Sequence, residues 1–397
     1  MRMLDREYQM IQDYIVKLRR ELHQIPEVGT DLPLTSNRVC AELDNLGIPY
    51  VRSHADSSIL ATISGEKPGK TIALRADMDG LEIIEETGVP YTSRRTGCMH
   101  ACGHDAHMAI LLGTARLLNG QRKKLHGTVR LIFQSGEEIS RGAEIVIRNG
   151  WLSGVDGIFG LHIGNILGKE IPNGTLVFPQ SCCMASFDKF IIRIKGQSCH
   201  GSTPEKGIDP VNIAAHLIVA LQTIQTREIS GTDSSVITIG KIEGGAQYNV
   251  IPKQVTLEGT IRALDETVRQ YIGKRIRGMS TAIAATFGGA CECEIILGAP
   301  PVVNDEEMAE LAASAVSDLF EPKDIISNFP IPNLGGEDFA NYLQCVPGAF
   351  FFLSSSNPQK GTDIPHHNPR FNIDEDVMWK GVIAFVRIVQ KFLDIGK

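Results

Sequence analysis

The run His-Ala-Cys-Gly-His-Asp-Ala-His at residues 100–107 constrains this chain more than any other feature. It places three imidazoles, a thiol and a carboxylate directly before an apolar stretch that predicts a helix from about Ala106 to Leu118. Packing explains such a run poorly, because His and Asp are seldom fully buried without partners. Cys102 and His104 cannot share a face in mid-helix, so they converge on one cation only at a loop-to-helix junction. A capped helix with incidental histidines is the alternative.

Length and composition predict a globular protein of two domains. The 397 residues exceed the usual size of a single core. A net charge of −7 offers no basic footprint for nucleic acid, and no run approaches the ~18 apolar residues of a membrane span. The first 20 residues do not have the pattern of a signal or transit peptide. Nine cysteines without regular spacing indicate reduced thiols, which favours a cytoplasmic protein. The charge and the lack of a long apolar run predict no nucleic-acid or membrane partner.

The order of strands and helices predicts an α/β fold with an inserted domain. Up to residue 185, apolar strands alternate with helices, which favours a mostly parallel sheet covered on both faces. Residues 186–297 instead follow the order β-α-β-β-α-β, typical of a ferredoxin-like α+β sandwich. We therefore assign residues 1–185 and 298–397 to one discontinuous domain and residues 186–297 to a second.

Carboxylate pairs follow two of the predicted parallel strands. Asp77 and Asp79 come at the end of one strand, and Glu137 and Glu138 come after the next strand. Ligands of open α/β sheets bind beyond the carboxyl ends of the strands. Adjacent carboxylates repel each other, so a half-buried pair is tolerable only when a cation or a proton neutralises it. These strand ends therefore indicate a cation site.

Further imidazoles lie far along the chain. His162 stands where another predicted strand stops, and a His-His pair occupies residues 366–367 in a loop. Structural zinc sites are closed and usually combine Cys and His ligands at short spacing, whereas these donors are spread over most of the chain and include carboxylates. The pattern favours an open, hydrolytic metal site. The alternative is a thiol mechanism with Cys102 as nucleophile and His104 or His107 as base, which leaves the glutamate pair and His162 unexplained.

Eight short runs occur in order along the chain. They are Arg75-Ala-Asp-Met-Asp, Met99-His-Ala-Cys-Gly-His-Asp, Gly136-Glu-Glu, Gly160-Leu-His, Asn249-Val-Ile-Pro, Gly259-Thr-Ile-Arg, Gly335-Gly-Glu-Asp-Phe and His366-His-Asn-Pro-Arg-Phe. Together they resemble the amidohydrolase branch of the aminoacylase/carboxypeptidase metallopeptidase superfamily, which includes hippurate hydrolases, N-acyl-amino-acid amidohydrolases and plant auxin-conjugate hydrolases. The resemblance covers nearly the whole chain. It implies a catalytic domain that holds two divalent metal ions and a lid domain that also forms a dimer.

Position by position, the resemblance implies metal ligands and a general base. The ligands would be Cys102, His104, Glu138, His162 and His367. Glu137 would take the proton of the attacking water, which bound cations make more acidic. Asp79 would orient a ligand histidine, because metal ligands commonly need such a partner behind them. Zn, Mn, Co and Ni all suit these mixed ligands, so two divalent ions per subunit are expected without a choice among these metals.

In the inserted domain the resemblance implies further site residues. His200 would reach the scissile carbonyl and stabilise the developing oxyanion. Asn249 and Arg262 would hold the substrate, Arg262 by gripping a carboxylate, and Gly335 and Gly336 would let the backbone approach the substrate closely. The edge strand of the predicted sheet offers unpaired backbone groups to a second copy. A homodimer through this domain is therefore expected, with His200 acting in its own subunit or across the dimer.

The expected activity is metal-dependent hydrolysis of the amide bond of a small N-acyl amino acid, with an acetyl, benzoyl or similar acyl group. A dipeptidase or carboxypeptidase on the same scaffold and a non-catalytic ligand-binding relative are the alternatives. This chain departs from the family pattern beside the pocket: Glu82 replaces a usual Pro, Cys199 a Gly, Glu205 a frequent His, and Gly164-Asn165 an aromatic-Pro ending. These departures bear on the substrate more than on the mechanism.

Overall fold

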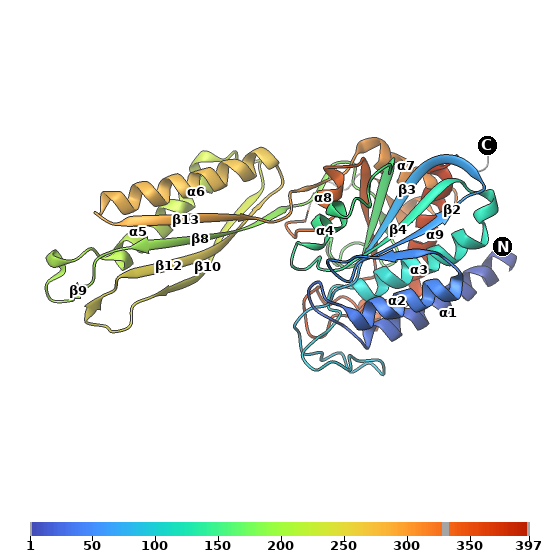
Figure 1. Cartoon of the computed structure of the whole chain (residues 1–397), viewed down its shortest axis with the longest axis horizontal. Coiled ribbons are helices and arrows are strands. Elements are labelled where there is room, and N and C mark those ends of the chain that lie inside the picture. Colours follow the sequence, from blue (N-terminus) through green and yellow to red (C-terminus); the bar gives the residue numbers. More distant parts are fainter. Residues whose placement is uncertain (1, 328–332, 395–397) are drawn as a thin grey trace. The chain divides into compact units, whose positions relative to one another are not determined.

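The computed structural model describes residues 2–327 and 333–394, and side chains from residue 9 onward. The chain divides into two compact units (Figure 1). Unit 1 comprises Met1–Ser181, Val303–Ile331 and Asp338–Lys397, and unit 2 comprises Cys182–Val302 and Pro332–Glu337. None of the helices in the described part of the chain combines the length and apolar character needed to cross a membrane. All nine cysteines are free thiols.

Unit 1 is built on an eight-stranded mixed sheet with the order β1-β2-β4-β3-β5-β16-β6-β15. The four central strands β4, β3, β5 and β16 are parallel, and antiparallel pairs flank them. The strands are β1 (Tyr50–Arg52), β2 (Ile59–Ser64), β3 (Lys67–Asp77), β4 (His126–Gln134), β5 (Gly157–Gly164), β6 (Leu176–Val177), β15 (Ile325–Ile326) and β16 (Gly348–Ser354). The predicted α/β class with a mostly parallel sheet is confirmed.

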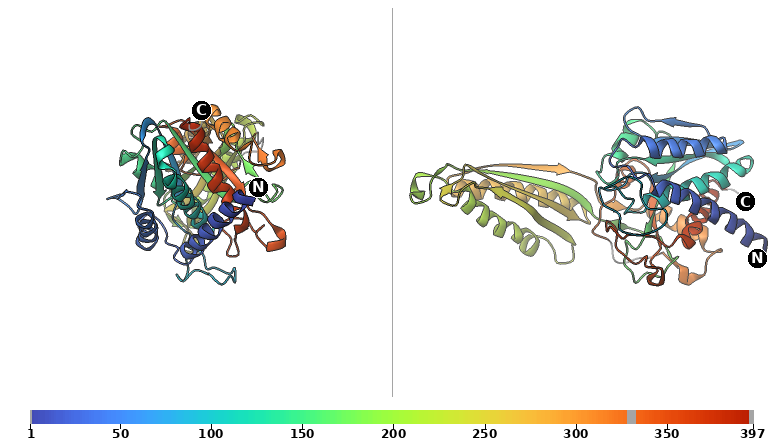
Figure 2. Two further views of the ribbon diagram at one scale, coloured as in Figure 1. Left: turned by 90° about the vertical axis from the view of Figure 1, so that its right-hand side faces the viewer. Right: turned by 90° about the horizontal axis from the view of Figure 1, so that it is seen from below.

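Helices cover the central strands of this sheet on both faces. Every residue of β3 from Ile72 to Asp77 is buried, which requires cover on each side because successive side chains of a strand point to opposite faces. Helices α1, α3 and α9 pack against one another (Figure 2). The helices of unit 1 are α1 (Arg2–His23), α2 (Pro33–Leu46), α3 (His104–Gly120), α4 (Gly142–Arg148), α7 (Glu306–Val316), α8 (Ala340–Leu343) and α9 (Met378–Phe392).

Unit 2 contains a four-stranded antiparallel sheet with the order β10-β12-β8-β13, on which two helices pack. Its elements are β7 (Cys182–Met184), β8 (Ser186–Lys195), β9 (Cys199–His200), α5 (Pro210–Thr223), β10 (Ser235–Gly244), β11 (Val250–Ile251), β12 (Gln254–Ala263), α6 (Glu266–Thr286) and β13 (Ala290–Leu297), followed by β14 (Val302–Val303). Alternate residues of β8 (Phe190, Ile192 and Ile194) enter its apolar core. The order β8-α5-β10-β12-α6-β13 confirms the predicted ferredoxin-like arrangement.

Short helical turns connect these elements. They are the 3-10 segments Arg122–Lys124, Pro204–Lys206, Pro322–Asp324, Pro358–Lys360 and Glu375–Val377, and the π-helical segment Ile224–Glu228.

Candidate metal centre

The predicted metal donors of unit 1 gather at the carboxyl ends of its parallel strands. β3 and β4 end side by side, with Asp77 opposite Gln134, so the acidic residues that follow the two strands become neighbours. β5 pairs with β3 on its other side. The prediction that this third strand stops at His162 was wrong, because β5 continues to Gly164. His162 is therefore held inside a strand and is buried.

A glycine turn brings Cys102 and His104 together. α3 begins at His104, two residues earlier than predicted, and Gly103 precedes it with φ 90°. This left-handed conformation favours glycine, and a Cβ on Gly103 would lie 3.2 Å from the carbonyl oxygen of Ile163. The ligand atoms of Cys102, His104 and His162 all lie within 4.8 Å of one another. The loop-to-helix junction thus brings the thiol and both imidazoles to one place.

Hydrogen bonds to carbonyl groups orient two of the histidines. Nδ1 of His104 lies 2.8 Å from the backbone oxygen of Asp79, and Nδ1 of His162 lies 3.1 Å from that of Ile163. Because a carbonyl only accepts, each Nδ1 donates the hydrogen and the Nε2 atom is the one that can ligate a metal. Nε2 of His162 lies 3.5 Å from Sγ of Cys102. Nε2 of His104 is buried and has no hydrogen-bond partner among the described residues.

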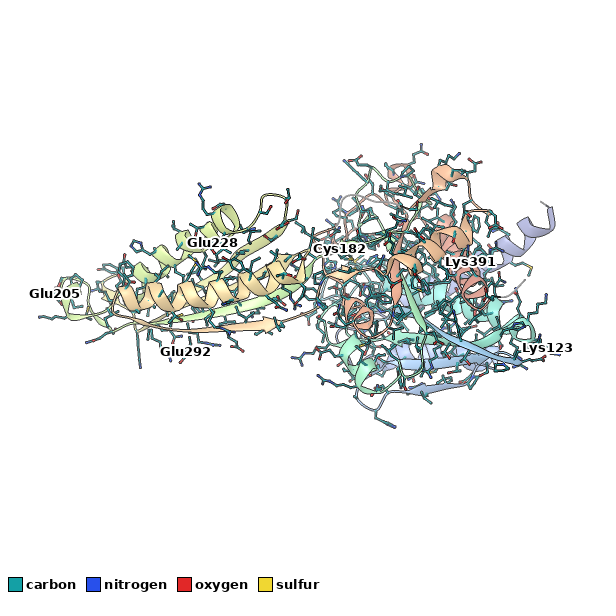
Figure 3. All side chains as sticks on the ribbon, turned by 90° about the horizontal axis from the view of Figure 1, so that it is seen from above. Lys123, Cys182, Glu205, Glu228, Glu292 and Lys391 are labelled. Carbon is teal, nitrogen blue, oxygen red and sulfur yellow. The ribbon has the colours of Figure 1, made fainter. Side chains whose placement is uncertain are left out.

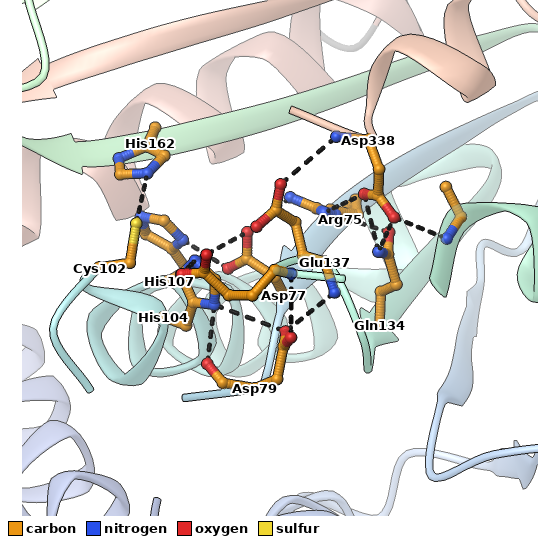
Figure 4. Close-up of polar contacts among 12 residues, drawn as sticks. Arg75, Asp77, Asp79, Cys102, His104, His107, Gln134, Glu137, His162 and Asp338 are labelled. Carbon is orange, nitrogen blue, oxygen red and sulfur yellow. Dashed lines mark hydrogen bonds and ion pairs between the residues drawn. The ribbon is translucent and has the colours of Figure 1, made fainter. Parts of the chain in front are cut away.

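Asp79 connects the glutamate pair to His104. Its Oδ1 accepts from the backbone N–H of Glu137 at 3.1 Å, and its Oδ2 accepts from that of Glu138 at 3.0 Å. Burial raises the pKa of the Asp79 carboxyl. The backbone oxygen of the same residue holds His104, so one residue aligns both the imidazole and the two glutamates (Figure 4).

Glu138 lies between two histidines. Its Oε1 is 3.8 Å from Nε2 of His104, and its Oε2 is 3.4 Å from Nε2 of His367. Oε1 has no hydrogen-bond partner among the residues that the structure describes. His367 is half-exposed, and its backbone N–H donates to the carbonyl of Ala101 at 2.9 Å, which ties the C-terminal loop to the His-rich run. Cys102, Glu138 and His367 form a second group with ligand atoms within 4.8 Å.

The charges around His104 favour a cation. Its ring nitrogens lie 3.6 Å from carboxylate oxygens of both Asp77 and Asp79, in addition to the contact with Glu138. Burial lowers the pKa of His104, but the charge of Asp77, the hydrogen bond with Asp79 and the charge of Glu138 together raise it to about 10. A proton on His104 therefore balances these carboxylates, and a divalent cation at Nε2 would replace that proton.

The donors fit divalent metal ions of intermediate softness. One thiol, three imidazoles and a carboxylate are the ligand types that Zn and its neighbours in the transition series accept. The buried Nε2 of His104 and Oε1 of Glu138 have no hydrogen-bond partner among the described residues, although buried polar atoms normally have one. His107 does not belong to this set, because its Nδ1 lies 2.6 Å from Oδ1 of Asp77 and its Nε2 accepts from the N–H of Ile163.

A buried polar network lies beside the glutamates and was not predicted from the sequence. Arg75, Gln134 and Asp338 are fully enclosed and hydrogen-bonded to one another (Figure 4). The buried hydroxyl of Tyr342 donates to Gln134. The one available signal was an arginine within an otherwise apolar strand. Such an arginine, when buried, requires carboxylate partners, but the sequence does not say which carboxylates.

The remaining predicted residues lie in unit 2, where His200 and Asn249 are neighbours. Val250 of β11 pairs with His200 of β9, and the carbonyl of Asn249 accepts from the N–H of Gly201 at 2.8 Å. Nδ1 of His200 accepts from the backbone N–H of Ser202 at 3.1 Å. Since that N–H can only donate, the neutral His200 ring carries its hydrogen on Nε2.

Arg262, Gly335 and Gly336 form a second group in unit 2. The guanidinium of Arg262 lies 5.2 Å from the centre of the Phe187 ring, within the range of a cation–π interaction. A Cβ on Gly336 would lie 2.0 Å from the same ring, so only glycine allows this approach. The N–H of Gly335 donates to Oδ1 of Asn333. Burial lowers the pKa of Arg262, although a guanidinium stays charged at neutral pH.

The two groups of unit 2 are far apart. Arg262 pairs with Phe187 at the start of β8, whereas His200 follows the end of that strand at Lys195. At roughly 3.3 Å per residue, β8 extends about 25 Å from Phe187 to Lys195, and β9 with His200 follows beyond that end (Figure 1). In Figure 3, Cys182 lies at one end of unit 2, and Glu205, which follows His200 by five residues in the sequence, lies at the other.

The α/β sheet, the Cys/His/Glu pocket at its strand ends and the ferredoxin-like unit define an enzyme of the metallopeptidase and amidohydrolase class. Residues 73–391 match Peptidase family M20/M25/M40, and the chain belongs to this family. The resemblance noted in the sequence is thereby confirmed.

Named relatives cover nearly all of the chain. It is 38% identical to N-acetyl-L-cysteine deacetylase of Bacillus subtilis, over 97% of this chain and 89% of the relative. It is 36% identical to thermostable carboxypeptidase 1 of Saccharolobus solfataricus, over 98% of each. The crystal structure of a dinuclear metal binding peptidase of the M20 family from Bacillus subtilis superposes with a TM-score of 0.84 at 33% identity, over 97% of this chain and 99% of that chain.

Proposed function

We propose that this chain is a metal-dependent amidohydrolase that cleaves the amide bond of N-acyl amino acids. The main support is that a thiol, three imidazoles and two adjacent glutamates lie together at the strand ends of unit 1. The deacetylase relative supports an N-acyl substrate. The carboxypeptidase relative, at nearly the same identity, favours peptide hydrolysis as a second candidate.

Five residues of unit 1 are proposed to hold two divalent ions, either Mn, Zn, Co or Ni: Cys102, His104, Glu138, His162 and His367. When bound, such ions lower the pKa of a water molecule toward neutrality. Glu137 is proposed as the general base that accepts the water proton and passes it to the leaving amine. Asp79 is proposed to keep Glu137 and His104 aligned through its three hydrogen bonds.

Unit 2 is proposed to supply substrate contacts. His200 with its hydrogen on Nε2 is a donor for the oxyanion. Arg262 is proposed to bind the carboxylate of the amino acid, beside the close-packed backbone at Gly335 and Gly336. Asn249 is proposed to bind substrate next to His200.

The length of unit 2 supports a homodimer. Because Arg262 lies at the start of β8 and His200 lies past its other end, a strand length of about 25 Å away, both touch one small substrate only if they come from different subunits. The edge strands β10 and β13 each have a partner on one side only among the described strands, and such edges pair readily with a second copy. We therefore propose a homodimer formed by unit 2, in which His200 acts across the interface. We also propose a cytoplasmic location, because the nine cysteines are free thiols.

Substrate preference tests the proposed activity. We expect kcat/KM for N-acetyl or N-benzoyl amino acids to exceed that for free dipeptides by at least about tenfold, assayed with each of the four metals. The amide of the same N-acyl amino acid is the matched control, since it lacks the carboxylate proposed to contact Arg262, and we expect it to react more slowly. Faster cleavage of dipeptides would instead favour the peptidase candidate.

Removal of the imidazole of His200 tests the role of unit 2. We expect His200→Ala to lower kcat by ~10² to 10³, the scale of a lost oxyanion donor, with unchanged metal content because His200 is not a proposed ligand. Mixing His200→Ala subunits with Glu137→Gln subunits tests the geometry. Recovered activity in the mixed dimer supports action across the interface, and no recovery with confirmed mixing contradicts it.

A further inference from the structure

A buried arginine joins the metal pocket to the C-terminal part of unit 1. Arg75 on β3 is 1% exposed. Its Nη1 donates to Oδ2 of Asp77 at 2.7 Å, its Nη2 to Oδ1 of Asp338 at 2.8 Å, and its Nε to Oε1 of Gln134 at 3.0 Å. A buried ion of this kind is tolerated only when it is paired and its donors are satisfied. Arg75 therefore holds the two carboxylates, which are 261 positions apart in the sequence, in one fixed arrangement.

Asp338 is held from several elements at once. Besides Arg75 on β3, the Nε2 of Gln134 on β4 donates to both of its carboxylate oxygens at 2.8 Å, and the backbone N–H of Ala143 on α4 donates to Oδ2 at 2.9 Å. Gln134 is itself fixed, because its Oε1 accepts from the hydroxyl of Tyr342 at 2.7 Å. The Asp338 side chain is fully buried. Because these contacts fix its carboxylate, they also fix the position of the Asp338 backbone.

The backbone of Asp338 in turn reaches Glu137. Its N–H donates to Oε1 of Glu137 over 3.4 Å (Figure 4). This is a long hydrogen bond. The other end of Glu137 is held by Asp79, which accepts from its backbone N–H. Glu137 is thus restrained at its backbone by one aspartate and at its carboxylate by another.

We propose that Asp338 is a positioning residue for Glu137, an inference that rests on the base role proposed above. The contacts with Arg75, Gln134 and Ala143 hold the Asp338 backbone so that its N–H fixes the orientation of the Glu137 carboxylate. Misplacement of a reacting group by ~1 Å costs about 10² in rate. The alternative is an ion pair that serves only the stability of unit 1. The two roles differ in one measurable respect, because only a positioning residue acts through Glu137.

The test is a double-mutant cycle on the metal-loaded enzyme. Asp338→Asn keeps the shape of the side chain but presents an N–H group to neighbours that are themselves donors, which loosens these contacts. We expect kcat to fall 10- to 100-fold, with KM within about threefold and metal content unchanged. In a Glu137→Gln background the same substitution should lower kcat by less than about twofold, because the carboxylate it positions is already gone.

Asp374→Asn is the matched control. Asp374 is also a buried carboxylate of unit 1 that accepts from a cation, Lys360, and from the side-chain amides of Asn173 and Asn357. These partners are not proposed metal donors, and we expect kcat within about twofold of wild type. An equal fall in kcat for both variants would overturn the positioning role.

Other outcomes are equally decisive. Unchanged kcat in Asp338→Asn, loss of metal, or a full additional loss in the Glu137→Gln background would each overturn the proposal. Tyr342→Phe is the second variant if Asp338→Asn does not fold, because it removes only the hydroxyl that holds Gln134. A two- to fivefold fall in kcat that disappears in the Glu137→Gln background supports the proposal. An unchanged kcat in Tyr342→Phe overturns it. Wild-type kcat in the single variant Glu137→Gln would overturn the base role of Glu137. Because this variant leaves Asp338 unchanged, it tests the base role separately from the positioning role.

Discussion

Removal of divalent metal should abolish amide hydrolysis by this enzyme, and adding back Zn, Mn, Co or Ni should restore it. We expect a loss of at least about 10³ in kcat/KM, because free water has a pKa near 15.7 and a carboxylate alone is a weak base toward it. The structure supports this expectation through the carboxylates that surround His104 and raise its pKa to about 10. Dialysis against a chelator, metal analysis of the protein and assay of an N-acetyl amino acid provide the measurement.

Thiol labelling separates this expectation from a cysteine mechanism. Sγ of Cys102 lies 3.5 Å from Nε2 of His162, a contact that a thiol–imidazole pair would also make. Bound metal should protect Cys102 from alkylation, whereas the exposed Cys345 serves as the control thiol and should react equally with and without metal. Full activity in metal-free protein, lost on alkylation of Cys102, would establish the thiol mechanism instead.

Glu137→Gln should lower kcat by ~10² or more while the metal content stays unchanged. The substitution preserves the size of the side chain and the acceptor oxygen that the Asp338 N–H reaches, but an amide cannot accept the water proton. The backbone N–H bonded to Asp79 is unaffected. Steady-state kinetics on a metal-saturated enzyme, with metal quantified in the same samples, measure the effect.

Glu138→Gln is the matched comparison for this prediction. Glu138 contacts Nε2 of both His104 and His367, so we expect its replacement to weaken metal binding as well as activity. The reverse pattern, with metal lost in Glu137→Gln and retained in Glu138→Gln, would exchange the two roles.

The sequence by itself determined the order of elements and pointed to most of the groups proposed as metal donors. Apolar periodicity is a local property, so the helix predicted from about Ala106 to Leu118 lies within two residues of α3 (His104–Gly120). The alternation of strands and helices in unit 1 and the β-α-β-β-α-β order in unit 2 were sufficient to predict the class of the two larger sheets. The cluster at 100–107 and the glutamate pair were recognisable because such residues are rarely placed together for packing.

Only the tertiary structure decided which atoms meet. The tautomers of His104 and His162 depend on carbonyl groups whose positions follow from chain geometry. The hydrogen bond between Arg75 and Asp338 could not be predicted, because residues far apart in the sequence form a contact without any local sequence pattern. The same holds for the separation of His200 from Arg262, which follows because β12 pairs Arg262 with the start of β8 while His200 lies past the end of β8. The sequence specifies the residue types, but the distances between side chains depend on how the strands pair.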